Sequence, residues 1–192
     1  MYKLCKTEQS ALRQRQLETG LLQVMEKTRY EDISISELCA QIGIPRKTFY
    51  RYFSSKDGAL HALLDHTLME FEMYNPPFLQ GKRTLLTDLE RFFHFWKQQK
   101  PLLDALERSD LSGVLIQQAL EYATSEVVFP GRFLPGESRR MQSHVVMFGV
   151  CGLLSMTLQW HHDGYKDTPR DLAVVAARLL TQPLFPDPNQ LM

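Results

Sequence analysis

The sequence predicts an all-α protein of about nine helices, and three observations support this fold class. Between Glu8 and Thr181 the apolar residues recur at spacings of three and four, the period of a helix with one buried face. Prolines and glycines are sparse and gather in a few places, where they separate these segments. No segment alternates polar and apolar residues for long enough to predict a strand.

The first two helices are defined by their N-terminal capping residues. Thr7 is a suitable cap for a helix over Glu8–Lys27. The pattern Ser34-Ile35-Ser36-Glu37 is a capping box, in which the serine caps the helix and the glutamate hydrogen-bonds back. The second helix is expected to run to about Gln41 and to stop at Gly43, which tolerates the left-handed conformation of a helix end.

The later helices follow the same kind of signal. A third, short helix is expected to begin near Pro45, a residue suited to a first helical turn, and to end at Phe53-Ser54-Ser55. The fourth is expected from about Lys56 to Met73. The others are expected at 84–99, directly after Pro101, at 111–127, at 137–162 and at 168–181.

Composition and charge limit the class of protein. The chain has 192 residues, of which 44% are hydrophobic, so it can form a packed core. No apolar run reaches the roughly 18 residues of a membrane span, and Met1–Gln16 lacks the apolar stretch of a signal peptide. We therefore expect a soluble, cytoplasmic protein without a membrane partner. Residues 1–60 carry ten Lys and Arg against seven Asp and Glu, and residues 61–192 carry twelve against fifteen. A basic N-terminal part fits nucleic-acid binding, although an imbalance of three charges is a small signal.

Motifs of metal and catalytic sites are missing from the sequence. Cys5, Cys39 and Cys151 lie far apart, which matches neither a disulfide framework nor the paired spacing of a zinc site. Neighbouring side chains of a helix point about 100° apart, so His161-His162-Asp163 is expected to be a polar helix end and not a metal site. No nucleophile elbow, phosphate-binding loop, dinucleotide fingerprint or zinc-protease helix occurs. We expect no metal, no cofactor and no enzyme activity.

The stretch from Ile33 to Leu60 reads as a helix-turn-helix, with a tight turn at Gly43. Ile44 and Phe49 are expected to hold the second helix against the first. This leaves an outer face with cations, a hydroxyl and phenols, a composition that suits the major groove of DNA: Arg46, Lys47, Thr48, Tyr50, Arg51 and Tyr52. The alternative is a solvated amphipathic helix whose tyrosines belong partly to the core.

This stretch resembles the DNA-binding signature of the TetR family of transcriptional regulators. In that signature a helix is followed by Gly-hydrophobic-Ser-x-x-Thr-aliphatic-Tyr-x-His/Tyr-Phe-x-x-Lys, then an acid and a leucine. Upstream, Tyr30 to Ser34 is similar to the aromatic-x-x-hydrophobic-Ser/Thr lead of the family, and the resemblance covers about residues 8–65. In this chain the signature stands as Gly43, Ile44, Pro45, Thr48, Phe49, Tyr50, Tyr52, Phe53, Lys56, Asp57 and Leu60.

Two positions depart from the family pattern. Pro45 stands where the family has a serine-like residue, so a cap oxygen is lost while a good first helical residue is kept. Lys47 stands where a small residue is common, and its long side chain can reach either a base or a phosphate.

The resemblance implies roles for individual residues. Arg46, Lys47 and Tyr50 are implied to read base edges. Lys56 starts the fourth helix, where its charge adds to the positive helix end. The implied phosphate contacts are Ser34, Ser36, Thr48, Tyr52 and Lys56.

The resemblance also implies an organisation and a function. Residues 1–60 would be the helix-turn-helix DNA-binding domain, and residues 61–192 a helical ligand-binding and dimerisation domain. The implied partners are a palindromic DNA operator, a second copy of the chain and an unidentified small-molecule effector. The expected function is a repressor that the effector releases from its operator. The alternative is a DNA-bound adaptor that acts through a protein partner without an inducer.

Two sets of residues in the C-terminal part are candidates for these roles. Small residues on the last two helices are expected to contact a second subunit, the alternative being that they pack within one subunit. Aromatic residues of the middle helices are expected to line a ligand pocket, the alternative being plain core. The dimer set is Gly149, Gly152, Ser155, Ala173, Ala176, Ala177 and Leu180, and the pocket set is Phe92, Phe93, Phe95, Trp96, Tyr122, Met147 and Cys151.

Overall fold

A computed structural model describes residues 7–74, 84–125 and 138–182 of the chain. Within these ranges nine α-helices and one short 3-10 turn form, and the all-α prediction is confirmed. The expected loops at 75–77 and 130–136 lie outside the described residues. The elements are α1 (Glu8–Met25), η1 (Tyr30–Asp32), α2 (Ile35–Gln41), α3 (Arg46–Tyr52), α4 (Lys56–Tyr74), α5 (Leu85–Gln98), α6 (Lys100–Arg108), α7 (Ser112–Thr124), α8 (Arg139–His162) and α9 (Pro169–Thr181).

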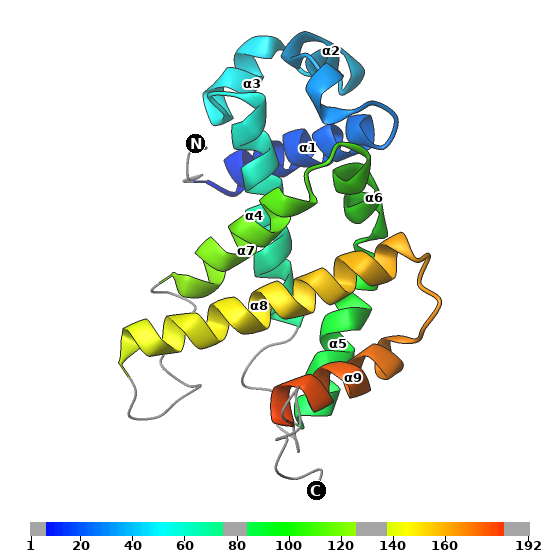
Figure 1. The fold of residues 1–192 in the computed structure, drawn as a ribbon. Coiled ribbons are helices and arrows are strands. Elements are labelled where there is room, and N and C mark those ends of the chain that lie inside the picture. The colour runs from blue at the N-terminus through cyan, green and yellow to red at the C-terminus, as the bar shows by residue number, and fades with distance from the viewer. Residues whose placement is uncertain (1–6, 75–83, 126–137, 183–192) are drawn as a thin grey trace, which may run out of the picture.

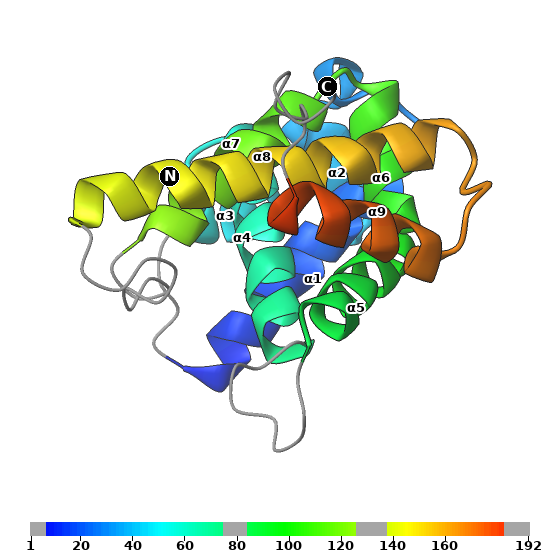
Figure 2. The same ribbon diagram turned by 60° about the horizontal axis from the view of Figure 1, so that its bottom comes forward.

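The helices form two parts joined by α4 (Figure 1). We call α1 to α3 the head and α5 to α9 the body. The helix α4 starts beside α3 and runs into the body, where it packs against α7. The long helix α8 packs along α7, and α9 packs on α5 (Figure 2).

The helix starts are fixed by the side chains that the sequence pointed to. The hydroxyl of Thr7 accepts a hydrogen bond from the backbone N–H of Ser10 at 3.2 Å. Ser34 and Glu37 form the predicted capping box at the start of α2. Thr168 and Asp171 form another capping box at the start of α9, where Pro169 is the first helical residue. These bonds satisfy backbone N–H groups that have no partner inside the helix.

One hydrophobic cluster runs without interruption from the head into the body. It includes Leu21 of α1, Phe49 of α3, Leu64 of α4 and Trp96 of α5, all exposed by 1% or less. The sequence-based domain boundary at residue 60 therefore falls inside α4 and inside a shared core. A smaller cluster in the body joins α5, α8 and α9 through Leu89, Phe93, Trp160, Ala173 and Ala176.

Polar side chains at the end of α6 bind the head. Arg108 donates to the carbonyl oxygen of Met25 at 3.0 Å. Ser109 accepts from the backbone N–H of Tyr30 at 2.9 Å, and Asp110 accepts from Arg29 at 3.0 Å. The last turn of α1 and the η1 turn are therefore held directly by the body.

Candidate nucleic-acid interface

The turn between α2 and α3 positions the exposed helix of the head. Gly43 adopts a φ of +67°, in the left-handed region that disfavours side chains with a Cβ. The N–H of Ile44 then donates to the carbonyl of Cys39 at 2.9 Å, which closes the turn. Pro45 precedes α3 in an extended conformation and gives the helix no side-chain cap. The predicted stop of one helix at Gly43 and the start of the next near Pro45 are confirmed, but Pro45 is the N-cap residue of α3 and not its first helical residue.

One residue holds α3 against the rest of the head. Phe49 is 0% exposed, and its ring lies 5.4 Å from that of Phe53, which is also fully buried. The ring of Tyr50 meets Phe49 edge-on at 5.7 Å while Tyr50 itself stays 46% exposed. The inner face of α3 is therefore aromatic and packed, as expected from the sequence.

The outer face of α3 carries the three residues predicted to read bases. Arg46, Lys47 and Tyr50 are all exposed, and Arg51 is exposed beside them. Cations and a phenol on one exposed face of a short helix can donate to the edges of bases in a major groove. The structure brings this set together, and its contact with bases remains a prediction.

The predicted phosphate contacts are spread over α2 and α3. Ser36 is exposed, and Ser34 is exposed while its hydroxyl donates to the Glu37 carboxylate at 2.6 Å in the capping box. Thr48 and Tyr52 are half-buried and line a pocket described below. Serine and threonine hydroxyls at such positions commonly bind phosphate oxygens, so this prediction also stays open.

Lys56 is placed differently from the sequence-based expectation. Its ammonium donates to the backbone carbonyls of Tyr30, of Ile33 at 2.7 Å and of Glu31 at 3.3 Å, and it lies 4.3 Å from the centre of the Tyr30 ring. Burial lowers the pKa of Lys56, against the raising effect of nearby acids such as Asp57. All three N–H donors are engaged within the head, so this geometry gives no support to a phosphate contact by Lys56.

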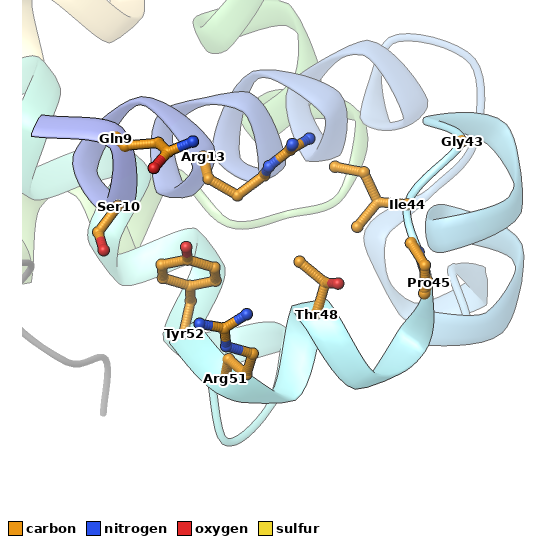
Figure 3. A pocket seen from close by; sticks show the side chains of 9 residues that line it. All are labelled: Gln9, Ser10, Arg13, Gly43, Ile44, Pro45, Thr48, Arg51 and Tyr52. Atoms are coloured by element: carbon orange, nitrogen blue, oxygen red, sulfur yellow. The ribbon is translucent and has the colours of Figure 1, made fainter.

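A polar pocket of about 450 Å³ lies between α1 and α3 (Figure 3). Residues from the first turns of α1 form one side, the α2–α3 turn forms the end, and α3 forms the other side. The hydroxyl of Tyr52 points toward α1 in Figure 3. The lining residues are Gln9, Ser10, Arg13, Gly43, Ile44, Pro45, Thr48, Arg51 and Tyr52.

The residues of α1 in this pocket were not among the candidates from the sequence. Gln9 and Ser10 are neighbours and Arg13 lies about one turn further on, on the polar side of an amphipathic helix. That spacing shows that they share a face, but only the fold shows that this face lies opposite α3. Arg51 was placed on the outer face of α3 from the sequence without a specific role.

The predicted pocket set in the body is divided between two packed clusters. Phe95 and Trp96, 3% and 1% exposed, belong to the core shared with the head, and Phe92 and Tyr122 pack against that core. Phe93 is 0% exposed and belongs to the smaller cluster, where its ring meets Trp160 at 6.0 Å.

Two further members of the predicted pocket set lie on α8. Met147 is 43% exposed, so it belongs to the surface and not to these packed rings. Cys151 is a free, half-buried thiol on the same helix.

Trp96 has an unusual polar atom. Its indole N–H is buried, and within the described part of the chain it has no hydrogen-bond partner. The indole of Trp160, by contrast, donates to the carbonyl of Asp167 at 3.1 Å. An unsatisfied buried donor costs about 1–3 kcal/mol. The Trp96 N–H is therefore a point in the body where an acceptor from a ligand would be favourable.

Part of the predicted dimer set is buried within one subunit. Ala173 and Ala176 are 0% and 1% exposed, and they pack against α5 in the smaller body cluster. The prediction that these two residues contact a second subunit is wrong, because no surface remains on them. Ala177 packs beside the same cluster and is half-buried.

The remaining dimer candidates lie on an open, apolar surface. Gly152 and Ser155 are exposed, Gly149 is half-buried, and Leu180 is 42% exposed. We call the exposed apolar side chains around them the α8–α9 face. Its large members are Met141, Val145, Met147, Phe148, Val174, Val175, Leu179 and Leu180.

The helix α8 has the length and composition of a possible membrane span. By length and composition Arg140–His162 could cross a bilayer, with a mean hydropathy of 1.4, and 22% of its apolar window is buried. A core helix of a soluble protein can pass the same test. One such helix is weak evidence for a membrane protein.

The histidines at the end of α8 bind acids of α6. His161 contacts Asp104 through Nε2 at 2.8 Å, and His162 contacts Glu107 through Nδ1 at 2.6 Å. Within the described residues no group of three potential metal ligands occurs. The polar helix end expected from the sequence thus links two helices of the body.

Comparison with known proteins is consistent with this architecture. Residues 21–63 match the model of the bacterial regulatory proteins of the tetR family. The chain is 27% identical over 135 residues to the HTH-type transcriptional regulator EthR of Mycobacterium tuberculosis and to that of Mycobacterium bovis. The match covers 63% of this chain and 62% of those relatives, so the chain spans less than two thirds of their length.

Two solved structures share the fold. FadR from Bacillus subtilis in complex with stearoyl-CoA superimposes with a TM-score of 0.59 at 16% identity, covering 89% of this chain and 99% of that one. The fatty acid degradation regulator FadR from Bacillus halodurans superimposes with a TM-score of 0.58 at 15% identity, covering 94% of this chain and 98% of that one. At these identities the likeness concerns the fold.

Proposed function

Because this chain belongs to the TetR family of bacterial regulatory proteins, we propose that it binds a palindromic DNA operator as a dimer and represses transcription. In this proposal α3 enters the major groove, residues 1–60 bind DNA, and residues 61–192 dimerise and bind an effector in the cytoplasm. This proposal rests on the difference between the two faces of α3. Phe49 is fully buried on one side, and Arg46, Lys47 and Tyr50 are exposed on the other.

Selection of DNA from a random-sequence pool with the purified protein tests this proposal. A two-fold dimer with one recognition helix per subunit selects a palindrome whose half-sites lie about one helical turn or somewhat more apart. Selected sites without a two-fold relation at any spacing would contradict the proposal.

Base reading by α3 is tested with single-base variants of the selected operator. A good base contact discriminates by about 1–3 kcal/mol, so Tyr50→Ala and Arg46→Ala should each relax preference at one symmetric pair of positions. For Tyr50→Ala the salt dependence should stay unchanged, because no charge is lost. If Tyr50→Ala instead weakened binding to all DNA sequences equally, Tyr50 would contact the sugar-phosphate backbone, and the proposal that it reads a base would be wrong.

We propose that Lys56 supports the head instead of holding a phosphate. Lys56→Ala removes an ammonium that bonds the carbonyls of Tyr30, Glu31 and Ile33. The variant should therefore lower the melting temperature while the slope of log K against log salt stays as in the wild type. Lys47→Ala is the control, because Lys47 is exposed and its loss should reduce DNA binding without reducing stability.

The α8–α9 face supports the dimer. Phe148 is 62% exposed and Val175 48% exposed in a single chain, an arrangement that favours burial against another surface. We propose that a second copy covers this face, with Gly152 allowing close approach. Gly152→Trp should convert the dimer to a monomer in sedimentation at micromolar concentration. A wild-type monomer that binds the operator tightly, or wild-type protein that partitions into lipid vesicles, would contradict this.

The unsatisfied indole of Trp96 supports an effector over the alternative of an adaptor without an inducer. We propose that an effector with an apolar part and a hydrogen-bond acceptor binds among α4, α5, α7 and α8 beside Trp96. Stearoyl-CoA, bound in FadR from Bacillus subtilis, is a first probe within a panel of apolar compounds. A compound that raises the melting temperature should release the operator, and Trp96→Phe should weaken both effects. Stabilisation without release of DNA would favour the adaptor.

A further inference from the structure

The pocket between α1 and α3 has the chemistry of an anion site. It is lined by two guanidinium groups, Arg13 and Arg51, and by the hydroxyls of Ser10, Thr48 and Tyr52. No carboxylate is among its lining residues, and Glu8 in the first turn of α1 does not line it. The pocket therefore combines a charge of two with neutral donors, and nothing in its lining neutralises that charge.

The two arginines differ from Arg15 and Arg29, two other arginines of the head region that are bound by acids of the chain. Arg15 forms ion pairs with Glu18 at 3.0 Å and with Glu70, and Arg29 forms ion pairs with Glu31 and with Asp110 at 3.0 Å. In the described residues Arg13 bonds only the neutral amide oxygen of Gln16, at 2.7 Å, and Arg51 is in no ion pair. The head thus has arginines engaged by acids inside the protein and arginines whose charge is open to an outside anion.

We propose that this pocket binds one phosphate of the DNA backbone, held between Arg13 of α1 and Arg51 of α3. The inference rests on the proposed DNA binding and adds α1 to the interface. A guanidinium presents several N–H donors in a plane, which suits the oxygens of a phosphate. A volume of about 450 Å³ accommodates the phosphate with part of its sugar.

This contact sets the position of α3 on the duplex. Phosphate contacts carry no sequence information, but they fix the register and orientation of a protein on DNA. Arg13 and Arg51 lie on different helices, so one phosphate bonded by both also fixes the tilt of α3 relative to α1. Arg13 and Arg51 are positioning residues for the bases that Arg46, Lys47 and Tyr50 read.

The test uses the full-length dimer and an operator selected from a random pool. The variants are Arg13→Gln, Arg51→Gln and both together, and the control is Lys166→Gln, an exposed lysine between α8 and α9. One phosphate contact adds about 0.9 to the slope of log K against log salt, so the double variant should lose roughly 1.8 per dimer. The control should lose nothing, and base preference should be unchanged in all variants.

Neutral methylphosphonates, placed one at a time in the operator, locate the phosphate. Neutralising the pocket's phosphate should weaken wild-type binding roughly ten- to a hundredfold, as expected for a lost hydrogen bond to a charged group. The double variant should be indifferent to that substitution and should respond normally to the others. If the double variant keeps the wild-type slope, or is as sensitive as the wild type at every phosphate, the proposal is overturned.

Two further results separate this proposal from others. If wild-type protein shows no salt-dependent binding to any DNA, the proposed function itself fails. A free anion is tested with inorganic phosphate against chloride at equal ionic strength. If phosphate raises the melting temperature of the wild type but not of the double variant, while both bind DNA with the same slope, the pocket is a site for a free anion and the DNA assignment is wrong. Unchanged melting temperatures of the variants without phosphate show that the substitutions do not unfold the head.

Discussion

The head and the body differ in the kind of side chain that they leave exposed. In the head the aromatic rings of Phe49 and Phe53 are 0% exposed, and the open face of α3 is cationic. In the body the open face of α8 and α9 is apolar, with Phe148 62% exposed. A cationic face is stable in water and attracts a polyanion, whereas exposed apolar side chains gain free energy when they are covered. The head of a single chain buries its aromatic rings, whereas the body of a single chain leaves large apolar side chains exposed.

The largest expected effect separates two phenylalanines. Phe49→Ala removes a fully buried ring, which typically costs about 3–5 kcal/mol of unfolding free energy. Phe148→Ala removes an exposed ring and should leave the stability of the monomeric Gly152→Trp background within about 0.5 kcal/mol, while weakening dimer association in the wild-type background. Urea unfolding and sedimentation measure the two quantities. An equal loss of monomer stability in both variants would contradict the difference in burial between the two rings.

The next effect concerns the contact of α1 with α2 in the head. A Cβ on Gly20 would lie closer than 3.0 Å to Cγ2 of Ile42, a β-branched side chain that cannot turn aside easily. Gly113 in α7 has open space around it. Both substitutions by alanine gain helix propensity, so the difference between Gly20→Ala and Gly113→Ala measures the cost of crowding, about 1–3 kcal/mol. Equal free energies of unfolding in urea for the two variants would show that α2 moves away from the new Cβ without loss of stability.

A smaller effect distinguishes the two tryptophans of the body. Trp160→Phe removes an indole N–H that bonds the carbonyl of Asp167, and about 0.5–1.5 kcal/mol of stability should be lost. Trp96→Phe removes an N–H that has no partner within the described residues, so it should be neutral or stabilising without ligand. The melting temperatures of both variants, measured by thermal unfolding, show whether the two indole N–H groups differ in this way. A larger loss for Trp96→Phe than for Trp160→Phe would remove the argument for a ligand acceptor at Trp96.

The smallest expected effect is the pH dependence of the contact between α8 and α6. The hydrogen bond to Glu107 raises the pKa of His162 above its ordinary 6.5. Because the folded pKa is raised, this contact stabilises fully below pH 6.5 and is lost as the pH rises through the folded value. An NMR titration should show a lower pKa for His162 in Glu107→Gln. The melting temperatures of the two proteins should differ most in acid and converge at alkaline pH.

The secondary structure was predictable because its signals are local. Ser34 with Glu37, Gly43 and Pro45 define one helix end and two helix starts within twelve residues, and each lies within one residue of the predicted position. These residues act on backbone groups one to four positions away, so no knowledge of the tertiary structure is needed.

The site was less predictable because its partners are distant in sequence. Both faces of α9 are apolar, and the sequence does not say which one meets α5, so Ala173 was assigned to the wrong surface. The direction of the Lys56 side chain depends on carbonyls more than twenty residues away. Arg13 is 38 residues from Arg51, and only the packing of α1 on the head brings both to one pocket.

The core that α4 shares between head and body has a consequence for hydrogen exchange. Leu60 and Leu64 of α4 contribute to the same cluster as Leu21 of α1 and Trp96 of α5. Regions that share a core open in one cooperative unit, and their slowest amides exchange with the free energy of global unfolding. The innermost amides of α1 and α5 should therefore exchange at matching rates, and a fragment ending at residue 60 should exchange as an unfolded chain.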